Sequence, residues 1–221
     1  MQIMGFPAGM FQTNCYIVAD DSGECVIVDP GQDAEPQVRR QVSEAGLKPR
    51  AVLLTHGHLD HIWNAQQVAD HYGVPAYIHP DDREMLADPA KAISMDISAL
   101  LKDTTFTEPA DVIEVFDGDT LTFGSMVFDV DHVPGHSRGS VSFRITVDTE
   151  EGPREVVLGG DVLFQDGVGR TDLPGGDTEV LLQSIAKKFL VLHDDAIVLP
   201  GHGPSTTIGR ERRSNPFLRD L

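Results

Sequence analysis

The sequence is poor in basic residues and in long apolar runs, and each shortage excludes a class of partner or protein. Its 221 residues carry 17 lysines and arginines against 35 aspartates and glutamates, which gives a formal net charge of −18. A chain this acidic repels the phosphates of nucleic acids and the surfaces of anionic membranes, so we expect neither as a partner. No apolar run reaches the roughly 20 residues that a membrane-spanning helix needs.

Cysteine is scarce as well, because the chain contains only Cys15 and Cys25. Two cysteines are too few for the disulfide framework that small secreted domains use. The first residues contain neither the basic segment nor the long apolar segment of a secretory signal. We therefore expect a cytoplasmic protein with reduced thiols in its core, with a disulfide between neighbouring strands as the alternative.

The rest of the composition is that of an ordinary folded protein. Apolar residues make up 40% of the chain and charged residues 24%, close to the usual values. No linker, low-complexity segment or short repeat interrupts the sequence, so residues 1–221 predict a single domain. A folded chain of this size buries about 70% of its unfolded surface, so it needs neither a disulfide nor a metal merely to fold.

Hydrophobic periodicity predicts strands and helices that alternate in the first half, followed by a run of strands. The expected strands cover residues 14–20, 24–29, 51–55, 76–79, 112–116, 120–123, 126–133, 140–147, 155–158 and 196–199. The expected helices cover 34–45, 62–72, 177–192 and 206–214, with one or two short helices between 80 and 110. This order predicts an α/β (α+β) protein and allows two sheets packed face to face with helices outside.

Four potential metal ligands fall within six residues, directly after a predicted buried strand: His56, His58, Asp60 and His61. Positions 56, 58 and 60 can face one way while the chain is extended, whereas position 61 begins a helix and turns another way. Imidazole and carboxylate ligands suit Zn²⁺, Fe or Mn. Four potential ligands within one short segment are not explained by a structural role. We therefore expect a metal site that can hold two ions.

Three more potential ligands stand where predicted strands end: His136, Asp161 and His202. Each follows an apolar run and a small or turn-forming residue. Catalytic residues gather on such loops because the sheet fixes their position while water and substrate can reach them. Alone, each would indicate only a turn; beside the four-ligand segment, which cannot complete two coordination shells, they are the expected remaining ligands.

The seven residues occur in the order typical of the metallo-β-lactamase-fold hydrolases, which the chain therefore resembles: His56-x-His58-x-Asp60-His61, then His136, Asp161 and His202. The resemblance implies an αββα sandwich, in which two mixed β-sheets are flanked by helices and the metals lie at one sheet edge. It implies one metal at His56, His58 and His136 and a second at Asp60, His61 and His202, with Asp161 bridging. We expect two divalent ions, Zn²⁺ first, with Fe or Mn as alternatives.

Such a pair of cations holds a hydroxide, lowers the pKa of its parent water toward neutrality and polarises a carbonyl for attack. We expect Asp60 and Asp161 to be the catalytic residues that orient this nucleophile and accept its proton. Asp29, at the end of a predicted strand, is a candidate for orienting a ligand histidine. The alternative for Asp29 is a turn formed by its Asp-Pro-Gly sequence.

Two further stretches, residues 167–177 and 201–217, resemble the short bacterial glyoxalase II-like (hydroxyacylglutathione hydrolase-like) enzymes. That family cleaves S-D-lactoylglutathione to D-lactate and glutathione. A thiolate leaves readily because the pKa of a thiol is near ~8.5, so no strong general acid is required. The resemblance therefore implies a small anionic thioester as substrate.

Arg170 is the predicted substrate-binding residue, because it stands where glyoxalase II enzymes place a basic residue that touches glutathione. A guanidinium can bind a carboxylate through two hydrogen bonds. The alternative pairs Arg170 with Asp172 or Asp177 to hold the loop. The chain departs from the long glyoxalase II enzymes, because Asp172 and Pro204 replace their tripeptide-binding tyrosines and it ends soon after His202. Another low-molecular-weight thiol is therefore the alternative carrier.

Other activities of the superfamily stay open. A persulfide dioxygenase resembles the chain through Gly169-Arg170-Thr171-Asp172 and would use one Fe at His56, His136 and Asp161. A lactonase shares all seven ligands and would release no thiol. The lactamases proper are expected to be less similar, since one group lacks a histidine at position 61 and the others an aspartate at position 161. A binding module without catalysis does not explain a complete ligand set.

Some residues are expected to be structural. The helix at 206–214 carries three arginines that we interpret as a solvated face, with substrate binding as the alternative: Arg210, Arg212 and Arg213. Trp63 is expected to pack against the core. Four histidines have no partner at ligand spacing: His71, His79, His132 and His193.

Overall fold

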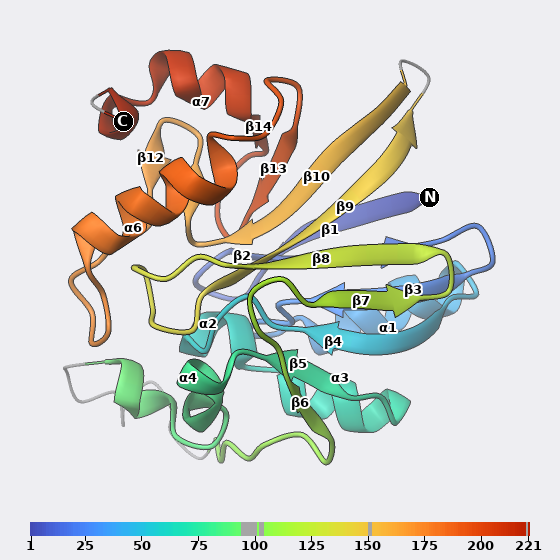
Figure 1. The fold of residues 1–221 in the computed structure, drawn as a ribbon. Helices are drawn as coiled ribbons and strands as arrows, with labels where there is room; N and C mark the ends of the chain where they lie inside the picture. Colours follow the sequence, from blue (N-terminus) through green and yellow to red (C-terminus); the bar gives the residue numbers. More distant parts are fainter. Residues whose placement is uncertain (94–100, 102–103, 150–151, 220) are drawn as a thin grey trace.

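Two six-stranded sheets are stacked face to face, with helices covering both outer faces (Figure 1). This is a computed structural model that describes the chain apart from residues 94–100, 102–103, 150–151 and 220. The first sheet has the order β1 (Gln2–Ala8), β2 (Thr13–Ala19), β3 (Glu24–Val28), β4 (Lys48–Leu53), β5 (Ala76–Ile78), β6 (Val112–Glu114). The second has the order β14 (Thr206–Thr207), β13 (Ile197–Pro200), β10 (Gly152–Gly160), β9 (Val141–Thr149), β8 (Met126–His132), β7 (Thr120–Phe123). A separate hairpin joins β11 (Leu163–Phe164) to β12 (Gly167–Val168).

Both sheets are mixed, and their parallel pairs are connected through helices. Strands β3 to β6 run parallel, and α1 (Glu35–Glu44), α2 (Leu59–Ile62) and α3 (Ala65–Tyr72) provide the first two crossovers. Among the described residues of the second sheet, only β10 and β13 are parallel, and α6 (Thr178–Ser184) with the π-helical η3 (Ile185–Phe189) lies between them in sequence. Parallel strands require such crossovers, whereas antiparallel neighbours need only turns. The predicted αββα sandwich is confirmed.

Three apolar layers hold the sandwich together, because successive side chains of a strand point to opposite faces. On β2, Cys15 and Ile17 face the helices of the first sheet, while Tyr16 and Val18 face the second sheet. Phe143 of β9 lies in this central layer and is fully buried. A third layer packs α6, η3 and α7 (Ile208–Ser214) against the outer face of the second sheet. Strands that are covered on both faces have continuous apolar sequences, so most of them could be predicted from the sequence.

Several boundaries differ from the sequence prediction. The predicted helix at 62–72 is two helices that break at Trp63 and Asn64, so that α2 carries Asp60 and His61. The helix predicted at 177–192 begins after Asp177, whose side chain accepts a hydrogen bond from the Val180 N–H (3.0 Å), and becomes π-helical from residue 185. Residues 206–207 are strand β14 rather than helix, and β1, β11 and β12 were not predicted.

The short helices expected between 80 and 110 are α4 (Pro80–Arg83) and the 3₁₀ helices η1 (Glu84–Leu86) and η2 (Pro89–Ala92). Residues 94–100 and 102–103 of this segment lie outside the described residues. A final 3₁₀ helix, η4 (Pro216–Leu218), follows α7. No helix among the described residues is long and apolar enough to cross a bilayer.

Both cysteines are buried free thiols, as predicted. Burial raises the pKa of Cys15 well above its usual value and that of Cys25 to about 12. Thiolate is the reactive form, so these two side chains act as small apolar core residues rather than as nucleophiles.

Replacing a central-layer side chain tests the packing. Phe143→Ala should lower the free energy of unfolding by about 3–5 kcal/mol, because a fully buried ring leaves a cavity between the sheets. Val191→Ala, at a side chain that is 70% exposed, should change it by less than about 0.5 kcal/mol. Urea unfolding of both variants gives the comparison, and equal stabilities would contradict the assignment of Phe143 to the core.

Candidate metal centre

All seven predicted ligands meet at one edge of the sandwich, and the strand directions explain why. Strands β8 and β10 are both antiparallel to β9, and β13 is parallel to β10, so all three end at the same edge. His136, Asp161 and His202 follow these three ends. His56 and His58 follow β4, whose end meets the second sheet through a hydrogen bond from the Val141 N–H to the Thr55 carbonyl (2.8 Å).

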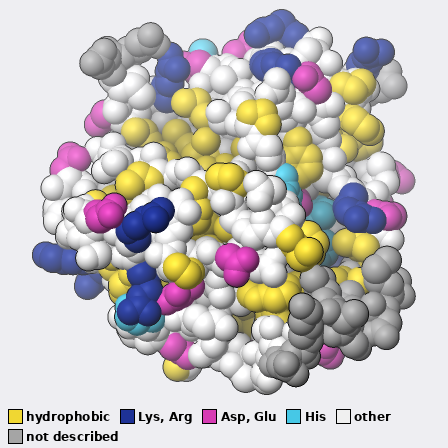
Figure 2. All heavy atoms as spheres, turned by 180° about the vertical axis from the view of Figure 1, so that it is seen from behind, with side chains coloured by type: hydrophobic (Ala, Val, Ile, Leu, Met, Phe, Trp, Pro, Cys, Tyr) yellow, Lys and Arg dark blue, Asp and Glu magenta, His cyan; other side chains and the backbone are white. Residues whose placement is uncertain are grey.

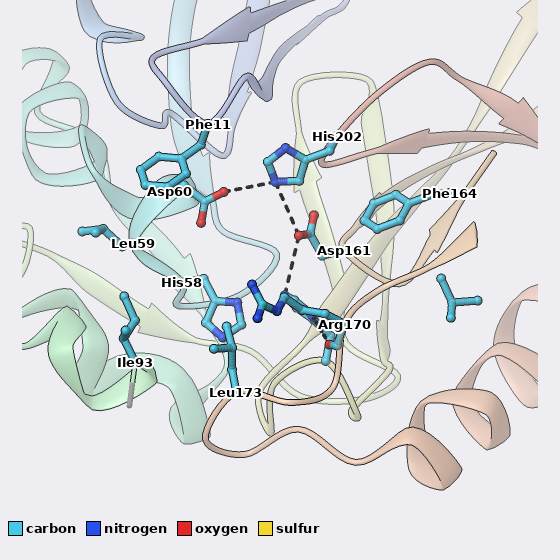
Figure 3. A pocket seen from close by; sticks show the side chains of 12 residues that line it. Phe11, His58, Leu59, Asp60, Ile93, Asp161, Phe164, Arg170, Leu173 and His202 are labelled. Carbon is cyan, nitrogen blue, oxygen red and sulfur yellow. Dashed lines mark hydrogen bonds and ion pairs between the residues drawn. The ribbon is translucent and has the colours of Figure 1, made fainter. Parts of the chain in front are cut away.

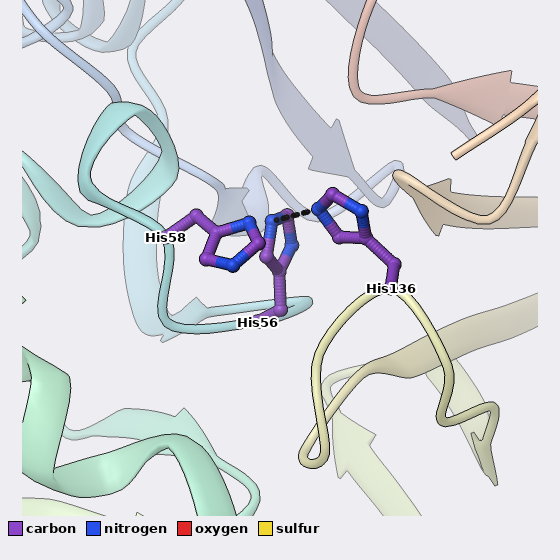
Figure 4. A group of neighbouring side chains, drawn as sticks. All are labelled: His56, His58 and His136. Atoms are coloured by element: carbon purple, nitrogen blue, oxygen red, sulfur yellow. Dashed lines mark hydrogen bonds between the residues drawn. The ribbon is translucent and has the colours of Figure 1, made fainter. Parts of the chain in front are cut away.

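The first cluster consists of His56, His58 and His136, all buried (Figure 4). One potential ligand atom from each lies within 4.8 Å of the others, and the Nε2 atoms of His56 and His136 are 3.2 Å apart. Burial lowers the pKa of His56 well below its usual value and that of His58 to about 3, helped by the neighbouring histidines. These two rings are therefore neutral, which is the form that binds a metal.

The second cluster consists of Asp60, His61 and His202. Oδ2 of Asp60 is 3.1 Å from Nε2 of His202 and 3.5 Å from Nε2 of His61. Asp161 lies between the two clusters (Figure 3): its Oδ2 is 3.6 Å from Nε2 of His136 and 3.5 Å from Nε2 of His202. Its Oδ1 is 3.4 Å from Nε2 of His61. This is the position that the resemblance implies for a bridging ligand.

The clusters contain buried polar atoms that make no hydrogen bond within the protein. Among the described residues five buried side-chain atoms lack a hydrogen bond, and three of them are here: His58 Nε2, His61 Nε2 and Asp161 Oδ1. Each such atom costs about 1–3 kcal/mol if it stays unpaired. Imidazole and carboxylate donors suit divalent Zn, Fe or Mn. The residues therefore fit two cations, one at each cluster.

Charges within the second cluster are strongly coupled. Burial alone would lower the pKa of His61, but Asp60, Asp161 and Asp29 raise it well above its usual value. Burial opposes ionisation of Asp60 and Asp161, yet His61 lowers the pKa of both carboxyls. Without a cation the cluster thus holds a proton on His61, and binding a metal there would release it.

Asp29 is hydrogen-bonded to His61, one of the predicted ligands. Its carboxylate accepts hydrogen bonds from Nδ1 of His61 (2.9 Å) and from the N–H and hydroxyl of Thr55 (2.8 and 2.7 Å). Because a carboxylate only accepts, Nδ1 of His61 donates and its Nε2 is left to face the cluster. Asp29 has a φ of +48°, a left-handed conformation that is typical of turns. The turn predicted for its Asp-Pro-Gly sequence and the contact with His61 are therefore both present.

Three further predicted ligands are also held by hydrogen bonds: His56, His136 and Asp60. The Thr55 hydroxyl gives its hydrogen to Asp29, so Nδ1 of His56 donates to Thr55 Oγ1 (3.0 Å). Nδ1 of His136 donates to the backbone carbonyl of Arg170 (2.8 Å). The Thr13 hydroxyl donates to Oδ2 of Asp60 (2.8 Å). These bonds fix which nitrogen of each ring is free for a metal.

Asp82 is a further residue of the site that sequence reasoning missed. It is fully buried and accepts hydrogen bonds from the Gly57 N–H (2.9 Å), the Ser137 hydroxyl (2.6 Å) and the Gly139 N–H (2.8 Å). Gly57 separates the ligands of the first loop and Ser137 follows His136, so Asp82 ties two ligand loops from different sheets. Nothing in the sequence distinguishes Asp82 from its exposed neighbour Asp81.

Glycine is required immediately before His202. A Cβ at Gly201 would lie 2.2 Å from Oδ1 of Asp161 and 2.6 Å from Cε1 of His61. Gly201 also fixes its loop on the first sheet, because its carbonyl accepts a hydrogen bond from the Asn14 N–H (2.7 Å). The Pro-Gly-His sequence at the end of β13 therefore reflects the crowding of ligands rather than turn formation alone.

A cavity of about 590 Å³ opens onto the ligands. Figure 2 shows histidine side chains in a hollow among apolar ones on this face. Besides five ligands and Arg170, the lining is apolar: Phe11, Leu59, Ile93, Phe164, Val168 and Leu173. Arg170 donates Nε and Nη2 to the Asp172 carboxylate at 2.7 Å each, so the predicted alternative pairing occurs while the side chain still lines the cavity. Asp177 caps α6 instead.

The remaining candidates lie away from the cavity lining. Arg210 pairs with Asp166 and Glu211, and Arg212 and Arg213 pair with Asp194, so these arginines fasten α7. Trp63 packs on Phe106, with ring centroids 5.4 Å apart.

Two histidines that were expected to lack a partner at ligand spacing do meet: His79 and His132. His79, Asp81 and His132 bring potential ligand atoms within 4.8 Å of one another. The two rings are stacked 4.2 Å apart and nearly parallel, and Nε2 of His132 is hydrogen-bonded to the Arg138 carbonyl.

Comparison with known proteins agrees with this geometry. A family model described as the metallo-beta-lactamase superfamily matches residues 8–202. The hydroxyacylglutathione hydrolase GloC of Haemophilus influenzae is 40% identical over 223 residues, covering 99% of this chain and 98% of that protein.

Two solved structures are similar over nearly the whole chain. One is the crystal structure of BLEG-1 B3 metallo-beta-lactamase, with 43% identity, a TM-score of 0.85 and coverage of 99% of this chain and 100% of that one. The other is TTHA1623 in a di-iron-bound form, with 36% identity, a TM-score of 0.78 and coverage of 97% and 100%. The first is a greater likeness than we expected for a protein named a lactamase.

The role of Asp82 can be tested through metal affinity. Asp82→Asn turns one carboxylate oxygen into an amide nitrogen that faces an N–H or hydroxyl donor, so the loops of the first cluster should loosen. We expect Zn²⁺ affinity, measured by chelator competition, to fall about 10–100-fold.

The matched control is Glu211→Gln. The Glu211 carboxylate of α7 is equally buried, and it accepts hydrogen bonds from the Asp166 N–H and from the side chain of Asn215. It should lower the melting temperature and leave Zn²⁺ affinity unchanged. Equal affinities in the two variants, both shown to be folded, would contradict a role for Asp82 at the metal centre.

Proposed function

The chain belongs to the metallo-β-lactamase superfamily, and on that basis we propose that it hydrolyses a small anionic thioester such as S-D-lactoylglutathione. Its general class is that of a metal-dependent hydrolase. The observation that carries the proposal is the set of seven ligand side chains in two clusters with Asp161 between them. The full-length likeness to a hydroxyacylglutathione hydrolase supports the thioester.

The residues of the chain would hold the metal ions, orient the attacking water and accept its proton. Two divalent ions, Zn²⁺ in the first instance and Fe or Mn as alternatives, would lower the pKa of a water and polarise the thioester carbonyl. Asp60 lies in the second cluster and Asp161 between the two clusters, so we propose that both orient the attacking water and accept its proton. Thr13 holds Asp60 in place, and Asp29 holds His61.

No strong acid is required for the leaving group. A thiol has a pKa of about 8.5, so the thiolate departs without prior protonation. Among the described residues, those that line the cavity include no lysine, tyrosine or cysteine, which agrees with a leaving group that needs no proton donor. An amide or alkyl ester would need one.

Arg170 is proposed to bind a carboxylate of the substrate. Both side chains of its ion pair with Asp172 are exposed, Arg170 by 60% and Asp172 by 68%. Exposed pairs contribute little free energy, so a substrate carboxylate can replace Asp172 at small cost. The two hydrogen bonds to Asp172 have the bidentate geometry in which a guanidinium binds a planar carboxylate, which supports the same arrangement with a substrate carboxylate.

A β-lactam is the second substrate class, because the likeness to BLEG-1 extends over the whole chain. A persulfide dioxygenase that uses only His56, His136 and Asp161 is distinguished by its need for O₂. A lactonase is distinguished by the absence of thiol release.

The decisive assay is thiol release from S-D-lactoylglutathione without O₂, on protein that contains two metals per chain. We expect release by the wild-type protein and its loss, by a factor of about 10³ or more, in His58→Ala and Asp60→Ala. Val191→Ala, remote from the cavity and 70% exposed, should retain it. Fully metallated protein that releases no thiol would overturn the proposal, and a chromogenic cephalosporin would then be tested.

Arg170→Gln tests carboxylate binding. It removes a charge-assisted contact, so KM for S-D-lactoylglutathione should rise about tenfold or more while kcat changes little. A neutral S-lactoyl-N-acetylcysteamine should show no such rise. Arg213→Gln, at an exposed arginine outside the cavity lining, should leave both KM values unchanged. An equal effect of Arg170→Gln on the two thioesters would contradict the assignment.

A further inference from the structure

Apolar side chains surround the candidate metal centre on several sides of the cavity (Figure 3). Phe11 comes from the loop between β1 and β2, and Leu59 from the start of α2. Phe164 and Val168 come from the small hairpin β11–β12, and Ile93 and Leu173 from two further loops. Four separate segments besides the ligand loops therefore contribute apolar groups to one cavity.

A lactoyl group uses little of this surface. It has one methyl group and one hydroxyl, whereas the cavity has a volume of about 590 Å³. Among the described residues that line the cavity, Arg170 is the only polar side chain apart from the ligands. A small polar acyl group would therefore leave the apolar walls exposed to water, which is unfavourable.

The two aromatic walls lie close to the reacting centre. Figure 3 shows Phe11 and Phe164 on opposite sides of His202. The ring of Phe164 stands edge-to-face to that of His202, with centroids 6.4 Å apart. Two aromatic rings of the cavity lining therefore flank one of the predicted metal ligands.

The loop that carries Phe11 is built to hold it there. Gly9 and Gln12 both have positive φ values, +60° and +56°. The side chain of Gln32 accepts a hydrogen bond from the Met10 N–H (3.1 Å), and a Cβ at Gly9 would lie 2.6 Å from the Gln32 side chain. The Gln12 N–H and side-chain amide both donate to the Gly9 carbonyl, so the turn that presents Phe11 to the cavity is closed by its own hydrogen bonds.

We propose that the preferred substrate is a thioester whose acyl group carries a large apolar substituent, of aryl or branched alkyl type. The substituent lies between Phe11 and Phe164, and the carboxylate of the thiol part binds Arg170. This proposal rests on the proposed thioester hydrolysis and adds the class of acyl group. Displacing water from apolar walls is the source of the preference.

Two thioesters that differ in one group give the test: S-lactoylglutathione and S-mandeloylglutathione, which have the same thiol and the same α-hydroxyl but carry methyl and phenyl. We expect kcat/KM to be at least about tenfold higher for the phenyl compound, since even one methylene in an apolar pocket discriminates by about 10–200-fold. Phe11→Ala and Phe164→Ala should each reduce this ratio toward one. Val191→Ala should keep the wild-type ratio.

Each outcome has a separate meaning. Thiol release from both compounds with a ratio of one or less overturns this inference and leaves thioester hydrolysis intact. A ratio that is high but unchanged in Phe11→Ala and Phe164→Ala overturns the placement of the acyl group. Release from neither compound by fully metallated protein overturns the proposed function, and this inference with it.

Discussion

The carboxylate of Asp161 is the contact on which the rest of the site depends. Its two oxygens lie 3.4–3.6 Å from ring nitrogens of His61, His136 and His202, which belong to both clusters. That position exists only because β8, β10 and β13 end at one edge and because Gly201 leaves room for the carboxylate. The sandwich, with its apolar layers, thus serves to bring ligands from four strand ends within reach of one side chain.

Much of this arrangement could be predicted because its signals are local. The segment 56–61 holds four ligands in six residues, and doubly buried strands are visible as apolar runs. Asp82 could not be predicted, because its three donors come from loops that only the tertiary fold brings to it. The break between α2 and α3 was missed for the same reason: at the break the Asn64 N–H donates to the Pro30 carbonyl and the Asn64 side chain accepts from the Glu35 N–H, contacts with a segment distant in sequence.

The residues that line the cavity were harder to predict than the metal ligands, because the tertiary structure brings them together. Arg170 was predicted from the resemblance to glyoxalase II enzymes, either to bind substrate or to pair with an aspartate of its loop. The structure is compatible with both roles, because the side chain pairs with Asp172 and lines the cavity. The apolar walls come from segments between residues 11 and 173, and no local pattern relates them. Function resides in such side chains rather than in the fold, which hosts several chemistries.

The central claim, that the chain holds two metals through these seven residues, is tested most directly by anomalous X-ray diffraction from crystals loaded with Zn²⁺. We expect two anomalous peaks, one in contact with His56, His58 and His136 and one in contact with Asp60, His61 and His202. Both peaks should contact Asp161. A single peak at the first cluster in fully loaded crystals would contradict the account and favour a mononuclear enzyme.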